Sequence, residues 1–326
     1  MSLKFSSDFF VLFKLFILNS TIKGTLFVAL GASSYGMLAS FVKMAYQQGF
    51  TTAEVTVSQY VFAIICLFVI NLFIKNTQIA TKKNILKLVI SGTSMGFTSV
   101  LYYLCVKYIN ASIAVVLLMQ SVWIGVLIEA FINKKVPSFA KLVAVGFVLL
   151  GTLLATKIFS DVITYDFKGF LFGFLAAVSF SITLYSTNSV AKYLNPFKRS
   201  FFMLLGGACI VFIFAMLTQL LPTYFNFNLV GSEFIAIKPF DTSILYTWGI
   251  LLSVFGTILP PILLNKGFPL IGVGLGSIVS AIELPVSVTF AFIFLQEQVL
   301  FSQWVGILII LAAVLLINWN LIAKKY

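Results

Sequence analysis

Ten long apolar segments, separated by mostly short linkers, constrain this chain more than any other feature. Each holds roughly 20 residues, the length that an α-helix needs to cross the hydrocarbon core of a bilayer. With 61% hydrophobic and 9% charged residues, a soluble domain would leave too much apolar surface in water. We therefore predict an all-α integral membrane protein with ten transmembrane helices. The segments cover residues 24–43, 54–74, 86–106, 110–132, 138–158, 168–190, 200–220, 244–265, 270–294 and 302–321.

Residues 1–23 hold no segment of this length. Their apolar run, FFVLFKLFIL, is short and is interrupted by Lys14, so we expect it to lie along the membrane interface. A secretory signal is the alternative, although no small-residue cleavage site occurs before the segment that starts at Gly24.

The basic residues predict the orientation. Sixteen of the 21 Lys and Arg residues flank the segments on the side that holds the N-terminus, and five flank the opposite side. Cytoplasmic flanks carry the excess of basic residues, so both chain ends are predicted to be cytoplasmic. A single arginine, with abundant Lys, Phe and Ile, is typical of an AT-rich genome and indicates a multi-pass protein of a bacterial inner membrane.

Several function classes are excluded or disfavoured by residue types. The chain has no histidine, and its three cysteines lie inside apolar segments without metal-ligand spacing, so we expect no metal and no cofactor. No nucleophile, base and orienting group occur at recognisable spacing, which argues against an enzyme. The basic residues are scattered between apolar segments rather than gathered on a soluble module, which argues against a nucleic-acid partner.

The segments repeat in two sets of five. Lys23-Gly24 opens the first segment and Lys168-Gly169 opens the sixth, and Gly151 and Ala313 take corresponding places in the fifth and tenth. Two repeats of five spans have opposite orientations in the membrane because five is odd. This inverted arrangement, predicted for residues 24–158 and 168–321, is typical of secondary transporters with a binding site between the halves.

Certain stretches resemble a known family. YGMLASFVKMA (Tyr35 to Ala45), KYINAS (from Lys107), the intramembrane Glu283 and the QEQ around Glu297 are similar to those of the drug/metabolite transporter superfamily, EamA type. The resemblance implies ten helices in two inverted five-helix units. It also implies export as the direction of transport.

Glu283 is the first candidate functional group. It lies near the middle of the apolar stretch that begins at Lys266, two residues before Pro285. A charge at the bilayer centre costs roughly 3 kcal/mol on insertion scales, so such residues usually face a bundle interior or a water-filled cavity. The alternative is a structural carboxyl that bonds to backbone groups freed near Pro285.

Polar and aromatic side chains at helical spacing predict a cavity around Glu283. Ser280 and Ser287 lie three residues before it and four after it, on the same helix face. The repeat pattern pairs Glu283 with Trp123, so one half is expected to contribute a carboxyl and the other an aromatic wall. The further predicted substrate-binding residues are Ser40, Lys43, Thr98, Tyr102, Gln120, Trp123, Tyr185 and Asn188.

These residues also have structural interpretations. Serine, threonine and glycine in membrane helices often mark close helix packing, and Lys43 can extend to the membrane interface. Pro260 and Pro261 are predicted to kink the eighth segment because two backbone donors are missing. With Pro285, they are candidates for a kink or a gate.

The sequence predicts a secondary-active or facilitative carrier that works by alternating access around a midplane cavity. Hydroxyl and aromatic groups without a Lys or Arg cluster favour a small neutral, zwitterionic or weakly cationic metabolite, such as an amino acid. Expected partners are this solute, the lipid bilayer and protons as a coupling ion; the oligomeric state is open. The alternative is a membrane assembly or signalling protein that binds partners through its helix faces.

Overall fold

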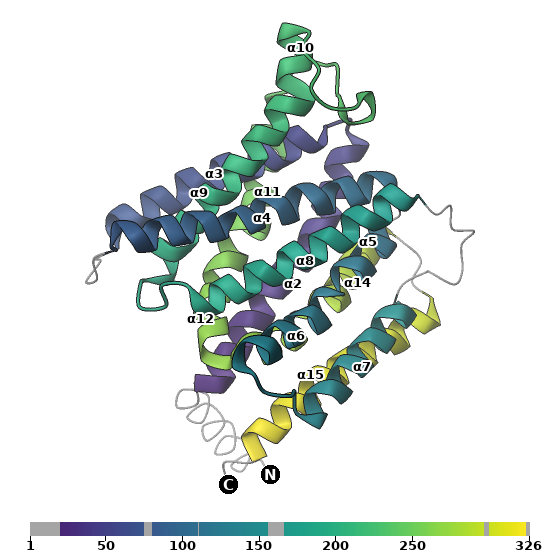
Figure 1. Ribbon diagram of the computed structural model, residues 1–326. Helices are drawn as coiled ribbons and strands as arrows, with labels where there is room; N and C mark the ends of the chain where they lie inside the picture. The colour runs from purple at the N-terminus through teal and green to yellow at the C-terminus, as the bar shows by residue number, and fades with distance from the viewer. Residues whose placement is uncertain (1–19, 75–79, 110, 156–165, 297–299, 324–326) are drawn as a thin grey trace, which may run out of the picture.

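The structure is a computed structural model that describes residues 20–74, 80–109, 111–155, 166–296 and 300–323 (Figure 1). Its regular elements within these ranges are helices. Most of the expected N-terminal interfacial segment, residues 1–19, lies outside the described residues, and so does Glu297. The prediction of an all-α chain is confirmed for the part that the structure describes.

Within the described ranges, seven helices are long and apolar enough to cross a membrane. They are α2 (Ser20–Gln47), α3 (Thr52–Phe73), α4 (Lys82–Tyr108), α8 (Phe167–Ser189), Pro196–Phe225 with α9 (Pro196–Ala215), Leu245–Ile271 with α12 (Leu259–Ile271), and Val273–Phe294. Three further helices have apolar stretches of only 10–17 residues: α6 (Ser121–Asn133), α7 (Phe139–Ala155, apolar stretch Phe139–Leu154) and α15 (Phe301–Ala323, apolar stretch Phe301–Leu316). A multi-pass membrane protein is thus supported, and the count of ten spans stays a prediction.

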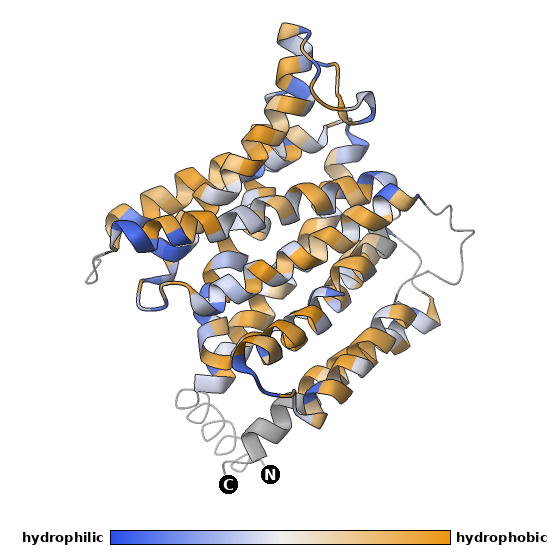
Figure 2. Ribbon diagram, viewed as in Figure 1, coloured by the Kyte–Doolittle hydropathy of each residue, from blue (hydrophilic) through white to orange (hydrophobic). Residues whose placement is uncertain are grey.

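Hydrophobic residues predominate along the helices, whereas hydrophilic residues gather at several helix ends and linkers (Figure 2). Large apolar side chains such as Phe73, Phe131 and Leu315 are exposed. A surface of this kind suits lipid rather than water.

The helices pack in a pattern that is nearly the same in the two halves. Helix α4 packs on α8, and α12 packs on α2. The pairs α3 with α9 and α7 with α15 join equivalent helices of the two halves. Figure 1 shows α7 and α15 side by side at one edge of the bundle. These contacts between the halves therefore come in equivalent pairs.

Two glycines show this equivalence in detail. Near the start of α2, a Cβ on Gly24 would lie 2.8 Å from Leu270 and 2.6 Å from Ile271, at the end of α12. Near the start of α8, a Cβ on Gly169 would meet Tyr108 and Ile109, at the end of α4. The glycines let the two helix pairs approach closely. The sequence correspondence between Gly24 and Gly169 thus reflects equivalent packing.

One segment in each half is broken at the same point. Helix α5 (Ala111–Leu118) and α6 are separated by two residues, and so are α13 (Val273–Ser280) and α14 (Glu283–Phe294); α5 and α13 each have eight residues. The same register pairs the first residues of α7 and α15. In this register Ser121 corresponds to Glu283, and Trp123 corresponds to Pro285. The structure therefore shifts the pairing of Glu283 with Trp123 that the sequence pattern predicted.

Pro285 contributes to the break in the second half. Pro285 has no N–H to donate to the carbonyl of Ala281, which instead accepts from the N–H of Leu284 at 3.2 Å. This tighter bond turns the chain between α13 and α14. The break before α6 has no proline, so its turn depends on the surrounding packing.

The π-helical turn η5 (Val254–Ile258) precedes Pro260 and Pro261 at the start of α12. In a π-helical turn the carbonyl of Phe255 would accept from residue 260, which has no N–H because it is proline. Instead the hydroxyl of Ser34 on α2 donates to this carbonyl at 2.9 Å. The proline pair thus leaves a backbone acceptor that a second helix satisfies.

Candidate functional site

A cavity with an empty volume of about 550 Å³ lies between helices of the two halves. The lining side chains come from α2, α3, α4 and α5 of the first half and from α8, η5 and α14 of the second. They are Tyr35, Leu38, Ala39, Gln59, Met95, Thr98, Ser99, Tyr102, Tyr103, Leu118, Phe180, Thr183, Gly256 and Glu283. We call this the central cavity.

Glu283 is the only acidic residue that lines the central cavity as the structure describes it. It is 6% exposed and is the first residue of α14. Among the described residues, its Oε2 atom has no hydrogen-bond partner. An unpaired buried carboxyl oxygen is costly, so this atom needs a partner that comes from the cavity.

The backbone of Glu283 is held close to α2. A Cβ on Gly36 would lie 2.5 Å from the Glu283 carbonyl oxygen and 3.0 Å from the Ser287 nitrogen. Gly36 therefore lets α14 begin directly against α2. This contact positions Glu283 beside Tyr35, the residue before Gly36, in the cavity wall.

Most hydroxyl groups in the wall are already bonded to protein atoms. Thr98 donates to the Ser94 carbonyl at 2.8 Å, and Thr183 shares a 2.8 Å bond with the Ser94 hydroxyl. Ser99 lies 3.1 Å from the Tyr60 hydroxyl. Such bonds tie these polar side chains to the helices and occupy hydroxyl donors that a solute would otherwise use.

Gln59 on α3 is the second polar group of the wall, and its position is fixed from several sides. The Tyr103 hydroxyl donates to Gln59 Oε1 at 2.8 Å. The Gln59 carbonyl accepts from Ser253 at 2.7 Å and from Thr257 at 3.2 Å. A Cβ on Gly256 would overlap Gln59 Nε2, so the absence of a side chain there makes room for the amide.

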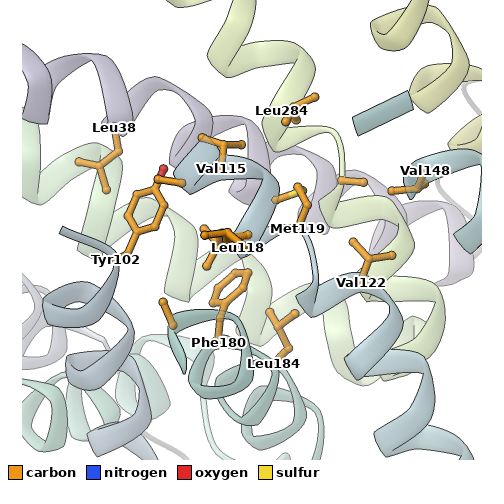
Figure 3. Close-up of a cluster of buried hydrophobic side chains, with 14 of the residues drawn as sticks. Leu38, Tyr102, Val115, Leu118, Met119, Val122, Val148, Phe180, Leu184 and Leu284 are labelled. Atoms are coloured by element: carbon orange, nitrogen blue, oxygen red, sulfur yellow. The ribbon is translucent and has the colours of Figure 1, made fainter. Parts of the chain in front are cut away.

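Apolar and aromatic side chains complete the wall. Figure 3 shows Leu38, Tyr102, Leu118 and Phe180 gathered in one hydrophobic cluster beside the α5–α6 break. The rings of Tyr35 and Phe180 meet edge to face, with centroids 5.8 Å apart. This geometry is favourable for aromatic pairs and gives a rigid wall.

The structure places three of the predicted site residues in the central cavity: Glu283, Thr98 and Tyr102. Other predicted residues are occupied elsewhere. Ser280 donates to the Gly276 carbonyl at 2.9 Å, and Trp123 Nε1 donates to Gln120 Oε1 at 2.8 Å. The remaining predicted residues do not line it: Ser40 is buried, and Lys43, Tyr185, Asn188 and Ser287 are half-buried.

The predicted kink residues do not line the cavity. Pro285 is buried two residues after Glu283, and Pro260 and Pro261 are buried at the start of α12.

Sequence reasoning did not select several residues that line the cavity, chiefly Gln59, Tyr35 and Tyr103. One signal was present for Gln59, because a glutamine inside an apolar span is expensive unless it is bonded. Tyr103 differs from Tyr102 by one position and points elsewhere on the helix. Its bond to Gln59 depends on the packing of two helices, which no local pattern encodes.

A second cavity, with an empty volume of about 820 Å³, lies near the start of α3 and the end of α4. Threonine hydroxyls and Lys107 line it together with aromatic rings. The Lys107 ammonium also donates to the Glu233 carbonyl at 3.0 Å.

A polar cluster around Glu54 ties helix ends together beside this second cavity. Glu54, at the start of α3, is fully buried and caps its own helix with Thr51. It accepts from Gln219 Nε2 at 2.9 Å and from the Asp241 N–H at 2.8 Å, and it lies 3.1 Å from Lys238 Nζ. Glu54 thereby attaches the linker that precedes residue 245 to α3.

Arg199 ties helix ends together at the opposite end of the bundle. Its buried guanidinium donates to the carbonyls of Val190 at 3.1 Å, Asn265 at 2.9 Å and Thr187 at 2.5 Å. These carbonyls belong to the end of α8 and to α12, so α8, α9 and α12 are joined. Within the described part of the chain, no group of three or more His, Cys, Asp or Glu side chains could hold a metal ion.

Comparison with known proteins agrees with this architecture. The sequence model of the EamA-like transporter family matches residues 22–157 and 167–319. A protein of known crystal structure has a TM-score of 0.67 at 14% identity, and the match covers 94% of this chain and 98% of that chain. At this identity, the likeness concerns the fold alone. No curated protein matches the sequence.

Proposed function

Because this chain belongs to the EamA-like transporter family, we propose that it carries a small neutral, zwitterionic or weakly cationic metabolite, such as an amino acid, across the membrane. Ten spans in two inverted five-helix repeats would alternately open the central cavity to each side. The equivalent packing of the two halves supports this arrangement. The export direction follows from the family resemblance.

The observation that carries the proposal is the unpartnered Oε2 of Glu283 in a cavity between the halves. No Lys or Arg lines this cavity among the described residues, which disfavours phosphorylated or strongly anionic solutes. A carboxyl that can bind either the solute or a proton suits a carrier. We therefore assign Glu283 as the solute-binding group and as the site of proton coupling, if the carrier is secondary-active.

The membrane assignment follows the distribution of charge. Lys266 lies over the rings of Phe27 and Phe197 at 5.6 and 5.1 Å, and Asn84 donates to Tyr193 at 2.6 Å. These contacts bring Lys266 beside α2 and the start of α9 and join the start of α4 to the linker before α9, so these lysine-flanked helix ends lie on one face. We place this face and both termini in the cytoplasm, and the protein in a bacterial inner membrane. A membrane assembly or signalling protein is the alternative function.

Uptake into proteoliposomes tests the proposal. Purified protein is reconstituted and offered labelled L-phenylalanine, L-threonine and putrescine, with empty liposomes as the blank. We expect saturable movement of at least one amino acid by the wild type and a loss of at least about tenfold in Glu283→Gln. If no solute moves above the blank, the carrier assignment fails; unchanged flux in Glu283→Gln would remove the role given to that residue.

A further inference from the structure

We propose that Gln59 determines which solutes the central cavity accepts, because it binds the anionic group of a zwitterion while Glu283 binds its ammonium group. This inference rests on the proposed carrier function and concerns the same site. It assigns the solute class as an α-amino acid rather than a simple amine or a simple carboxylic acid.

The first step concerns which polar atoms remain available in the cavity. The hydroxyls of Thr98, Thr183 and Ser99 are bonded to protein atoms. Among the described residues, Glu283 Oε2 has no partner, and no hydrogen bond engages Gln59 Nε2. Besides the hydroxyls of Tyr35 and Tyr102, the wall therefore offers one unpaired carboxylate oxygen as an acceptor and one free amide group as a donor.

The second step concerns the orientation of the Gln59 amide. The Tyr103 hydroxyl donates to Oε1 at 2.8 Å, and both side chains are buried. An amide whose oxygen is engaged in this way presents its NH₂ group on the other side, where it lies against Gly256 in the cavity wall. Tyr103 is therefore a positioning residue, and Gln59 is the residue that touches the solute.

The third step concerns how firmly Gln59 is held. Its backbone carbonyl accepts from Ser253 and Thr257, one helical turn apart. Because the backbone and the amide oxygen are both anchored, the amide N–H groups are pre-organised and a solute orders few side chains on binding.

The last step concerns the chemistry that fits both groups. A carboxylate acceptor suits an ammonium group, and an amide N–H suits a carboxylate oxygen. The two groups come from α3 of the first half and α14 of the second, so a solute with both charges joins the halves. A simple amine leaves the Gln59 donor unused, and a simple acid faces Glu283 without a counter-charge.

Competition for uptake of labelled L-phenylalanine tests the inference. The competitors are unlabelled L-phenylalanine, 2-phenylethylamine, which lacks the carboxylate, and 3-phenylpropanoate, which lacks the ammonium group. For the wild type we expect L-phenylalanine to compete at least about tenfold better than either analogue. In Gln59→Leu the advantage over 2-phenylethylamine should fall by about tenfold, while the advantage over 3-phenylpropanoate is kept.

Tyr103→Phe provides a second variant that keeps the ring and removes only the hydroxyl that orients Gln59. We expect it to lose carboxylate preference in the same direction as Gln59→Leu, by a smaller factor. Tyr60→Phe is its matched control, since the Tyr60 hydroxyl bonds to Ser99 rather than to Gln59, and its preference should equal that of the wild type.

The outcomes separate the two proposals. If the wild type moves amino acids but Gln59→Leu and Tyr103→Phe lower the rate without changing the ratio between L-phenylalanine and 2-phenylethylamine, the role of Gln59 is wrong and the carrier function stands. If all three compounds compete equally in the wild type, the role of Gln59 is likewise wrong and the carrier function stands. If the wild type moves no amino acid, the proposed function itself fails.

Discussion

The ammonium group of Lys238 lies 3.1 Å from Oε2 of Glu54, a carboxylate that is fully buried at the start of α3. Glu54 also accepts hydrogen bonds from Gln219 and from the backbone of Asp241. One carboxylate thus replaces its lost hydration with partners from two separate parts of the chain, Gln219 and the linker that holds Lys238 and Asp241. A buried carboxylate of this kind stabilises the structure only while all of its hydrogen-bond and ion-pair partners are present.

Removal of this carboxylate should therefore destabilise the protein. We expect Glu54→Ala to lower the free energy of unfolding by about 3 kcal/mol, because its donors lose a buried acceptor. The midpoint of thermal unfolding in detergent measures the effect. Glu233→Gln is the control, since the Glu233 pair with Lys168 is half exposed and should matter little. Equal midpoints for the two variants would contradict the assignment.

Arg199 should behave similarly at the other end of the bundle. Arg199→Met leaves three backbone carbonyls without their donor, and we expect a loss of about 3 kcal/mol. Arg199→Lys should recover only part of it, because an ammonium group cannot reproduce the planar fork. Thermal unfolding again provides the measurement, with the exposed Lys192→Gln as control. Full recovery in Arg199→Lys would show that charge alone matters.

The contact between α2 and the start of α14 predicts a different kind of defect. A methyl group at position 36 would press on the Glu283 carbonyl, so Gly36→Ala should cost about 2 kcal/mol and slow uptake. Gly146 on α7 is a matched control, since a Cβ there meets no atom within 4 Å. Gly146→Ala should be neutral or stabilising by up to about 1 kcal/mol. Wild-type uptake in Gly36→Ala would disprove the importance of this packing.

Replacement of Pro285 is expected to maintain or raise the stability of the protein while it lowers the rate of transport. Pro285→Ala supplies an N–H that can donate to the Ala281 carbonyl, so α13 and α14 would approach a continuous helix. We expect equal or higher thermal stability together with at least about tenfold slower uptake, because Glu283 would turn relative to the cavity. Parallel unfolding and flux measurements on the same preparation test this. A fully active variant would mean that the break has no role in transport.

Features encoded by neighbouring residues could be predicted from the sequence. The apolar segments, the correspondence of Gly24 with Gly169 and the buried carboxyl at Glu283 each follow from local composition or from a repeated pattern. The family resemblance drawn from those patterns is confirmed by the match over both repeats.

Features that depend on how two helices meet could not be predicted. Ser280 shares a helix face with Glu283 in sequence, yet its hydroxyl bonds to Gly276 on its own helix. Conversely, Gln59 and Tyr103 have no sequence relationship and meet only because α3 and α4 pack together. Helical spacing gives the face that a residue occupies, but not which neighbour that face contacts or whether its hydroxyl is already used.

The two broken segments have one further consequence. They match in position and nearly in length, yet only the second has an acid and a proline directly after its break, since Ser121 and Trp123 occupy the corresponding places in the first. If transport exchanges the shapes of the two halves, the inward-facing and outward-facing forms are not energetic mirror images. The carrier would then bind the solute with a different apparent affinity at each side of the membrane. At saturating solute, transport would be faster in one direction than in the other even without a coupling ion.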